Sequence, residues 1–95
     1  MQSALVPTIL DWTRIEAALE GLDVVDAMAQ AFKSYSAGLA VIPPVGELNF
    51  QSPPGDAHIK YGYLKGGNHY VVKIASGFYD NPKLGLPSSQ GLMLL

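Results

Sequence analysis

The sequence contains no cysteine, and this absence excludes disulfides, thiolate zinc sites and cysteine nucleophiles. It has a single arginine, Arg14, and a net charge of −2. Because nucleic-acid binding requires a basic surface, no nucleic-acid partner is expected. Charged residues make up only 15% of the chain and hydrophobic residues 48%. Polar side chains are therefore scarce, and we expect an apolar interface with a second copy or with another domain.

Long hydrophobic runs are also missing. No run approaches the roughly 20 residues that a membrane-spanning helix requires. Residues 1–10 lack a basic start and contain Pro7, which argues against a signal peptide. Together with the absence of cysteine, these features predict a cytoplasmic protein with no membrane partner. The length of 95 residues predicts a single domain over residues 1–95.

The first third of the chain has the pattern of two helices. Thr13 and Glu16 have the spacing of a capping box, which predicts a helix over residues 14–20 that ends at Gly21. Asp23 is a suitable N-cap for a second helix, which would end at Gly38. Apolar residues at helical spacing form a stripe along this second helix and predict packing against a sheet: Val25, Met28, Phe32 and Tyr35.

The remainder of the chain has the pattern of strands. We expect a short strand over residues 45–50, a loop over 52–56, and two alternating strands over 58–64 and 70–76. A long loop over residues 77–90 would lead to a last strand over 91–95. The whole pattern predicts an α+β fold, in which two N-terminal helices pack on a mostly antiparallel sheet and the protein forms a dimer. Because the last strand is apolar and has no polar cap, we also expect the chain to be a truncated product or a fragment.

The turn between the two alternating strands predicts their register. Gly66-Gly67 favours a tight turn, and a hairpin centred on it pairs Tyr63 with Tyr70 on one face and Lys60 with Lys73 on the other. Like charges directly opposite each other destabilise a hairpin. A bound anion, a carboxylate such as Glu47, or a lowered lysine pKa could each offset the repulsion.

Several short motifs together resemble one known family. They are Phe32-Lys33-Ser34-Tyr35-Ser36-Ala37-Gly38, Ile42-Pro43-Pro44, His58-Ile59-Lys60-Tyr61-Gly62-Tyr63, Val72-Lys73-Ile74-Ala75-Ser76-Gly77-Phe78, Asn81-Pro82, Gly85-Leu86-Pro87-Ser88 and Gly91. In this order they are similar to the N-terminal part of the ornithine cyclodeaminase/mu-crystallin family. The resemblance implies a substrate-binding and dimerising domain. It also implies that a Rossmann domain, which holds NAD(P) in full-length members, is absent from these 95 residues.

The same resemblance implies roles for individual residues. Lys73 matches the lysine at the reacting substrate and is the candidate catalytic residue, while Lys60 and Ser88 match positions that line the substrate pocket. Glu47 is a further candidate for this pocket. It lies where many members carry an arginine that binds the substrate carboxylate, and this departure argues against ornithine as the substrate. The chain shows no Gly-rich nucleotide loop and no metal-binding spacing, so neither a cofactor site nor a metal site is expected.

Two classes of function follow from this reading. The first is a truncated member of the family that retains the dimerising sheet and part of an amino- or imino-acid site, and is not catalytic alone. The alternative is a free-standing module that binds a small carboxylate or another protein. The sequence also leaves open that a separately encoded Rossmann domain completes the enzyme.

Overall fold

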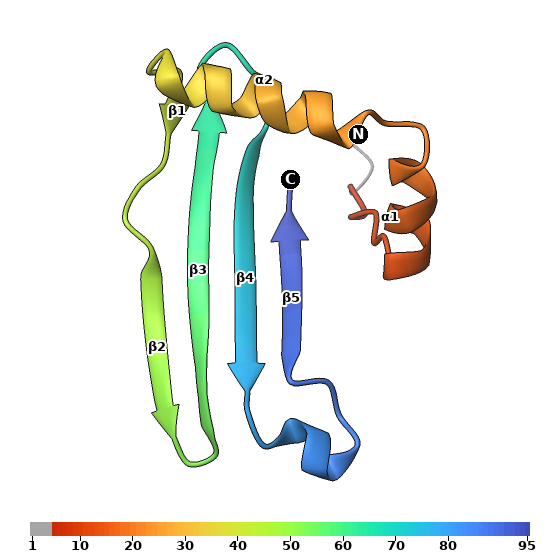
Figure 1. Ribbon diagram of the computed structural model, residues 1–95, viewed down its shortest axis with the longest axis vertical. Coiled ribbons are helices and arrows are strands. Elements are labelled where there is room, and N and C mark those ends of the chain that lie inside the picture. Colours follow the sequence, from red (N-terminus) through yellow and green to blue (C-terminus); the bar gives the residue numbers. More distant parts are fainter. Residues whose placement is uncertain (1–4) are drawn as a thin grey trace. The chain divides into compact units, whose positions relative to one another are not determined.

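A computed structural model describes residues 5–95 and divides the chain into two compact units, the first ending at Lys33 and the second formed by Ser34–Leu95. The helices are α1 (Trp12–Leu19) and α2 (Val24–Ser36), and the rest of the chain forms a five-stranded antiparallel sheet (Figure 1). The predicted α+β class, with two N-terminal helices and an antiparallel sheet, is therefore confirmed. The packing of the helices on the sheet, and the single domain, stay predictions.

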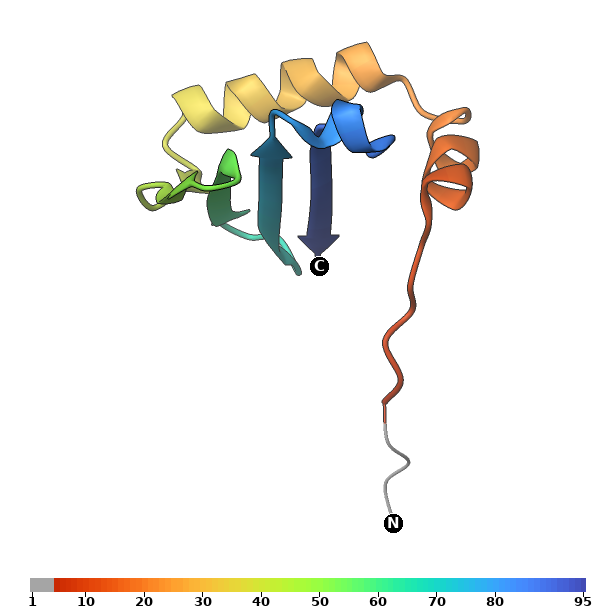
Figure 2. The same ribbon diagram turned by 90° about the horizontal axis from the view of Figure 1, so that it is seen from below.

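Aspartate side chains define where the two helices begin. The backbone N–H of Arg14 donates to Asp11 Oδ1 at 3.0 Å, so Asp11 caps α1 and the predicted capping box at Thr13 is wrong. The helix begins earlier than predicted because Asp11 takes the extended N-cap conformation. The predicted cap of the second helix is confirmed, since the backbone N–H of Asp26 donates to Asp23 Oδ1 at 3.0 Å. Figure 2 shows α1 and α2 as separate helices with a short connection.

The strands are β1 (Ala40–Val41), β2 (Gly46–Gln51), β3 (Pro54–Leu64), β4 (Tyr70–Phe78) and β5 (Ser89–Leu94). The central order is β1-β3-β4-β5, and β2 also pairs with β3 (Figure 1). Because β4 occupies the other side of β3, β1 and β2 share one edge of β3 in succession. The short strand β1 was not predicted. It pairs with the end of β3 through Ala40 and Leu64.

Strand pairing extends the sheet into segments that were predicted as loops. The predicted loop over 52–56 is wrong in its second half, because β3 already begins at Pro54. The predicted loop over 77–90 is also too long: β4 continues to Phe78 and β5 begins at Ser89, with a 3₁₀ helix (Asn81–Leu84) between them. Glycine is unfavourable in isolated strands, but Gly55 and Gly77 are held here by partners on both sides.

Two aromatic rings flank Gly55, at the end of the sheet away from the β3–β4 turn. Gly55 lies opposite Phe50 on β2 and opposite Phe78 on β4. The two phenyl rings stack across it, with centroids 5.5 Å apart and an interplanar angle of 23°. A Cβ atom at Gly55 would lie 2.4 Å from the carbonyl oxygen of Gly77. Glycine is therefore required at this point, where three strands approach closely.

The two faces of the sheet differ in chemistry. Because side chains alternate along a strand, the observed register gathers apolar residues on one face: Leu48, Phe50, Ile59, Tyr61, Tyr63, Tyr70, Val72, Ile74, Leu92 and Leu94. Most of these side chains are exposed, and none of the hydrophobic side chains in residues 5–95 is fully buried. The opposite face, which contains Glu47, His58 and the two strand lysines, is called the lysine face below.

Candidate functional site

The lysine face is centred on the pair formed by Lys60 and Lys73. The predicted register is confirmed: Tyr63 lies opposite Tyr70, and Lys60 lies directly opposite Lys73. Both lysines are on central strands of the sheet and both are exposed. Two positive charges are therefore fixed side by side by backbone pairing, in a position that attracts an anion.

A shallow depression lies at this pair. It has a volume of about 240 Å³ and is lined by His58, Lys60, Lys73 and Ala75. His58 lies opposite Ala75, two residues along β3 from Lys60, and its side chain is about 39% exposed. His58 is not among the site residues predicted from the sequence, although the hairpin register places it on the same face as the lysines.

Glu47 lies next to this depression but contacts His58. It is opposite His58 in the β2–β3 ladder, and Glu47 Oε1 is 3.6 Å from His58 Nε2. This contact is an ion pair only when the imidazole is protonated. The structure thus shows no contact of Glu47 with either lysine, and Glu47 as a substrate-binding residue stays a prediction.

Ser88 lies at the other end of the sheet. Its carbonyl oxygen accepts a hydrogen bond from the backbone N–H of Phe78 at 2.8 Å. Phe78 is five residues beyond Lys73 on β4, which corresponds to roughly 16 Å along a strand. The structure brings Lys60 and Lys73 together but does not bring Ser88 to them. The assignment of Ser88 to the same pocket stays a prediction.

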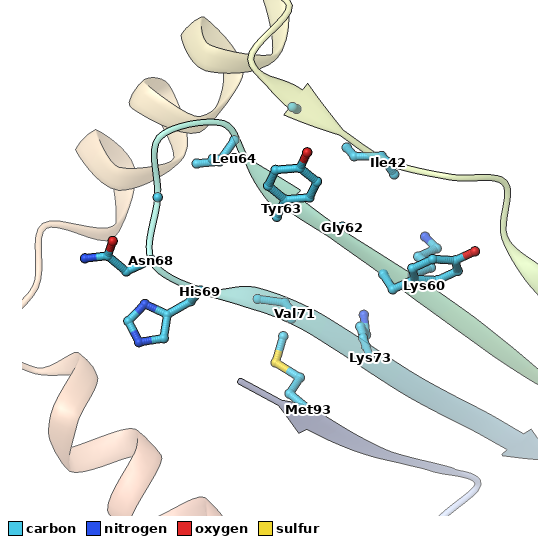
Figure 3. Close-up of a pocket in the computed structure, with 13 residues that line it drawn as sticks. Ile42, Lys60, Gly62, Tyr63, Leu64, Asn68, His69, Val71, Lys73 and Met93 are labelled. Carbon is cyan, nitrogen blue, oxygen red and sulfur yellow. The ribbon is translucent and has the colours of Figure 1, made fainter.

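A second, larger pocket begins at the lysines and extends toward the β3–β4 turn. It has a volume of about 510 Å³. In Figure 3 Lys60 and Lys73 lie at one end of it, and Asn68 and His69 lie at the other. Most of the lining residues are apolar, and they come from separate strands, so the pocket was not predicted from the sequence: Ala40, Ile42, Leu64, Val71 and Met93. Tyr61 and Tyr63 also border it, although their side chains belong to the apolar face.

The glycine-rich turn between β3 and β4 does not fit a nucleotide. Residues 65–69 lead directly from β3 into the strand β4, and no helix begins there. A dinucleotide loop holds its pyrophosphate at a helix N-terminus, where backbone N–H groups are free. Gly66 has a φ of 85°, which serves the tight turn. The glycines here therefore close a hairpin.

In residues 5–95 no three His, Asp or Glu side chains gather closely enough to hold a metal ion. None of the helices in that part of the chain combines the length and the apolar character needed to cross a membrane. The Tyr79 hydroxyl donates to Asp56 Oδ2 at 2.7 Å, which links the end of β4 to β3.

This hydrogen bond to Asp56, together with partial desolvation and the negative charges of Asp56 and Glu47, raises the pKa of the Tyr79 hydroxyl above its ordinary 10.0. Because a raised pKa favours the neutral phenol in the folded state, the contribution to stability is present below pH 10 and is lost as the pH rises through the raised value. Ultraviolet titration should therefore show one tyrosine that ionises above pH 10. In Asp56→Asn this ionisation should return toward pH 10, and an unchanged titration curve would contradict the assignment of the raised pKa to the Tyr79–Asp56 hydrogen bond.

The chain is similar in sequence to three proteins with curated names. It is 34% identical over 85 residues to a Rhizobium meliloti protein provisionally named as a dehydrogenase, covering 84% of this chain. It is 39% identical over 75 residues to an uncharacterised cyclodeaminase of Sinorhizobium fredii, covering 78% of this chain. It is 30% identical over 87 residues to the alanine dehydrogenase of Archaeoglobus fulgidus, covering 92% of this chain.

The matches cover only part of each relative. The chain spans 26%, 23% and 26% of the length of these three proteins, which is about a quarter in each case. No family model matches the chain, and no solved structure gives a significant match. The relationship therefore rests on sequence similarity to this quarter of the relatives.

Proposed function

The chain is related to the ornithine cyclodeaminase family over about a quarter of the length of its relatives, and from this premise we propose that it is the substrate-side part of such a protein. In this proposal the lysine face binds the carboxylate of a small amino or imino acid. The observation that carries the proposal is the direct pairing of Lys60 with Lys73 in the β3–β4 ladder.

Physical chemistry supports an anion at this pair. Two like charges directly opposite each other weaken a sheet, and a bound carboxylate would convert this repulsion into two favourable charge-assisted contacts. Glu47, a carboxylate of the lysine face, contacts His58. Lys73 is proposed to hold the reacting end of the substrate and to assist proton transfer at its amine, and Lys60 is proposed to hold the carboxylate.

Hydride chemistry requires more than these residues. The dehydrogenase relatives imply that full-length family members depend on NAD(P), which would carry the hydride. The position of the glycine-rich turn between two strands supports the proposal that this turn does not hold a dinucleotide. We therefore propose that residues 1–95 bind without catalysing, unless a nucleotide-binding domain completes the site.

The alternative function is a free-standing carboxylate-binding module. It is favoured by the position of the site: every residue that lines the depression and the larger pocket lies in the unit Ser34–Leu95. Self-association is also proposed, because the apolar sheet face includes side chains as exposed as Tyr70 at 67% and Leu92 at 58%. Covering such a face with a second copy would remove apolar surface from water.

A thermal-shift panel tests the proposal. Alanine, proline, pyruvate and cyclic imino acids would be titrated with and without NAD(H) and NADP(H), and light scattering of the same samples would report the oligomeric state. We expect carboxylates to raise the melting temperature with the logarithm of their concentration, independently of nucleotide. Lys73→Ala should abolish the rise.

Lys65→Ala is the matched control, because it removes the same charge from the β3–β4 turn without touching the pair. Loss of the rise in Lys65→Ala as well would mean that only net charge matters. The absence of a shift with any carboxylate would refute binding at the lysine face. A monomer at every concentration would refute the proposed self-association.

A further inference from the structure

We infer that the preferred ligand has a single negative end and an apolar body, and that a cationic tail is excluded. This inference rests on the proposed carboxylate site and extends it to the rest of the ligand. The polarity of the lysine face differs on the two sides of the lysine pair. On one side of the lysine pair lie His58 and Glu47, and on the other side the lining is almost entirely apolar.

The register of β3, β4 and β5 accounts for the apolar lining on one side of the lysine pair. Met93 on β5 lies opposite Lys73, and Val71 lies two residues before Lys73 on the same face of β4, at a distance of roughly 7 Å. Gly62 lies opposite Val71. A Cβ atom at Gly62 would be 2.6 Å from the carbonyl oxygen of Val41 and 3.4 Å from Ile42 Cγ1, so glycine lets β1 approach closely and bring Ile42 to the pocket.

The pocket therefore continues from the two charges over an apolar floor. Ile42, Leu64, Val71 and Met93 lie along it between the lysines and the turn (Figure 3). A ligand whose carboxylate binds the lysines can place an apolar chain on this floor and remove both surfaces from water. An extended chain of five carbons spans roughly 6 Å, about the separation of Lys73 and Val71.

A positive charge at the end of that chain would meet no acidic side chain in the pocket lining. None of the thirteen residues that line the pocket is acidic. Within the unit Ser34–Leu95, the three acidic side chains have other partners: Glu47 contacts His58, Asp56 accepts from Tyr79, and Asp80 contacts Lys83. Asn68 and His69 are the remaining polar groups, but His69 is four residues from Lys73, or roughly 13 Å along the strand. An ammonium group placed on the apolar floor would lose water without gaining a hydrogen bond.

A matched set of carboxylates tests the inference by calorimetry on the full chain. Pentanoate and 5-aminopentanoate differ only in the terminal ammonium group, and acetate lacks the tail. We expect pentanoate to bind about tenfold more tightly than either of the other two. Met93→Glu should weaken pentanoate and strengthen 5-aminopentanoate, whereas Met93→Gln, which has the same shape without the charge, should not strengthen 5-aminopentanoate.

The outcomes separate the two proposals. Equal affinity for all three ligands, abolished by Lys73→Ala, would leave the carboxylate site standing and would overturn the apolar ligand class. Tighter binding of 5-aminopentanoate by the unaltered chain would overturn it as well. Binding of none of the three would overturn both the carboxylate site and this extension of it.

Discussion

Gly55→Ala is expected to lower the free energy of unfolding by about 2–3 kcal/mol. The added methyl group would lie 2.4 Å from the carbonyl oxygen of Gly77 and 2.6 Å from the Phe78 ring. The first of these neighbours is backbone of the adjacent central strand, so relief requires β3 and β4 to separate where they also pair with other strands. For a chain of this size the melting temperature should fall by roughly 10–20 °C, as measured by circular dichroism.

Gly46→Ala is the matched control for this change. Gly46 is also a strand glycine of the same sheet, but a Cβ atom there would meet nothing closer than Ile59 Cβ at 3.7 Å, an ordinary contact. We expect its melting temperature to change by a few degrees at most. A similar loss of stability in both variants would show that glycine is not required at Gly55 in particular.

Lys73→Met should have opposite effects on stability and on binding. Without ligand it removes the repulsion from Lys60, which weakens the sheet by about 0.2–1 kcal/mol, so the melting temperature should rise by a few degrees. Methionine at this position would also lie opposite Met93. Carboxylate affinity should fall roughly 10- to 100-fold, because a hydrogen bond to a charged group is lost.

Salt separates the electrostatic part of this effect. The Debye length falls from about 8 Å at 0.15 M to about 3 Å at 1 M salt, so the stability gain of Lys73→Met should shrink at high salt. Lys65→Met, in the turn, should change neither the stability nor the affinity. A lower melting temperature for Lys73→Met would contradict the idea that the two lysines repel each other in the free protein.

The hairpin is the part of the fold that local sequence determined. Gly66-Gly67 fixed the turn, and the alternation on both sides fixed the faces, so the Lys60–Lys73 pair followed from nearest-neighbour geometry alone. Asp23 marked the start of α2 for the same reason, because a cap acts within one helical turn. At α1 the predicted cap was wrong, because the structure uses Asp11 instead of Thr13.

The resemblance to the ornithine cyclodeaminase family was also available from sequence, since its motifs extend along most of the chain and the three relatives match 84%, 78% and 92% of it.

The tertiary structure decided what lies beside the hairpin. It placed β1 and β2 in succession along β3, stacked Phe50 on Phe78 across Gly55, directed Glu47 to His58, and left Ser88 far from the lysines. Turn chemistry and capping act over a few residues, and so they can be predicted from the sequence. Contacts between distant strands depend on which pairings satisfy the most backbone hydrogen bonds together, and only the assembled sheet determines them.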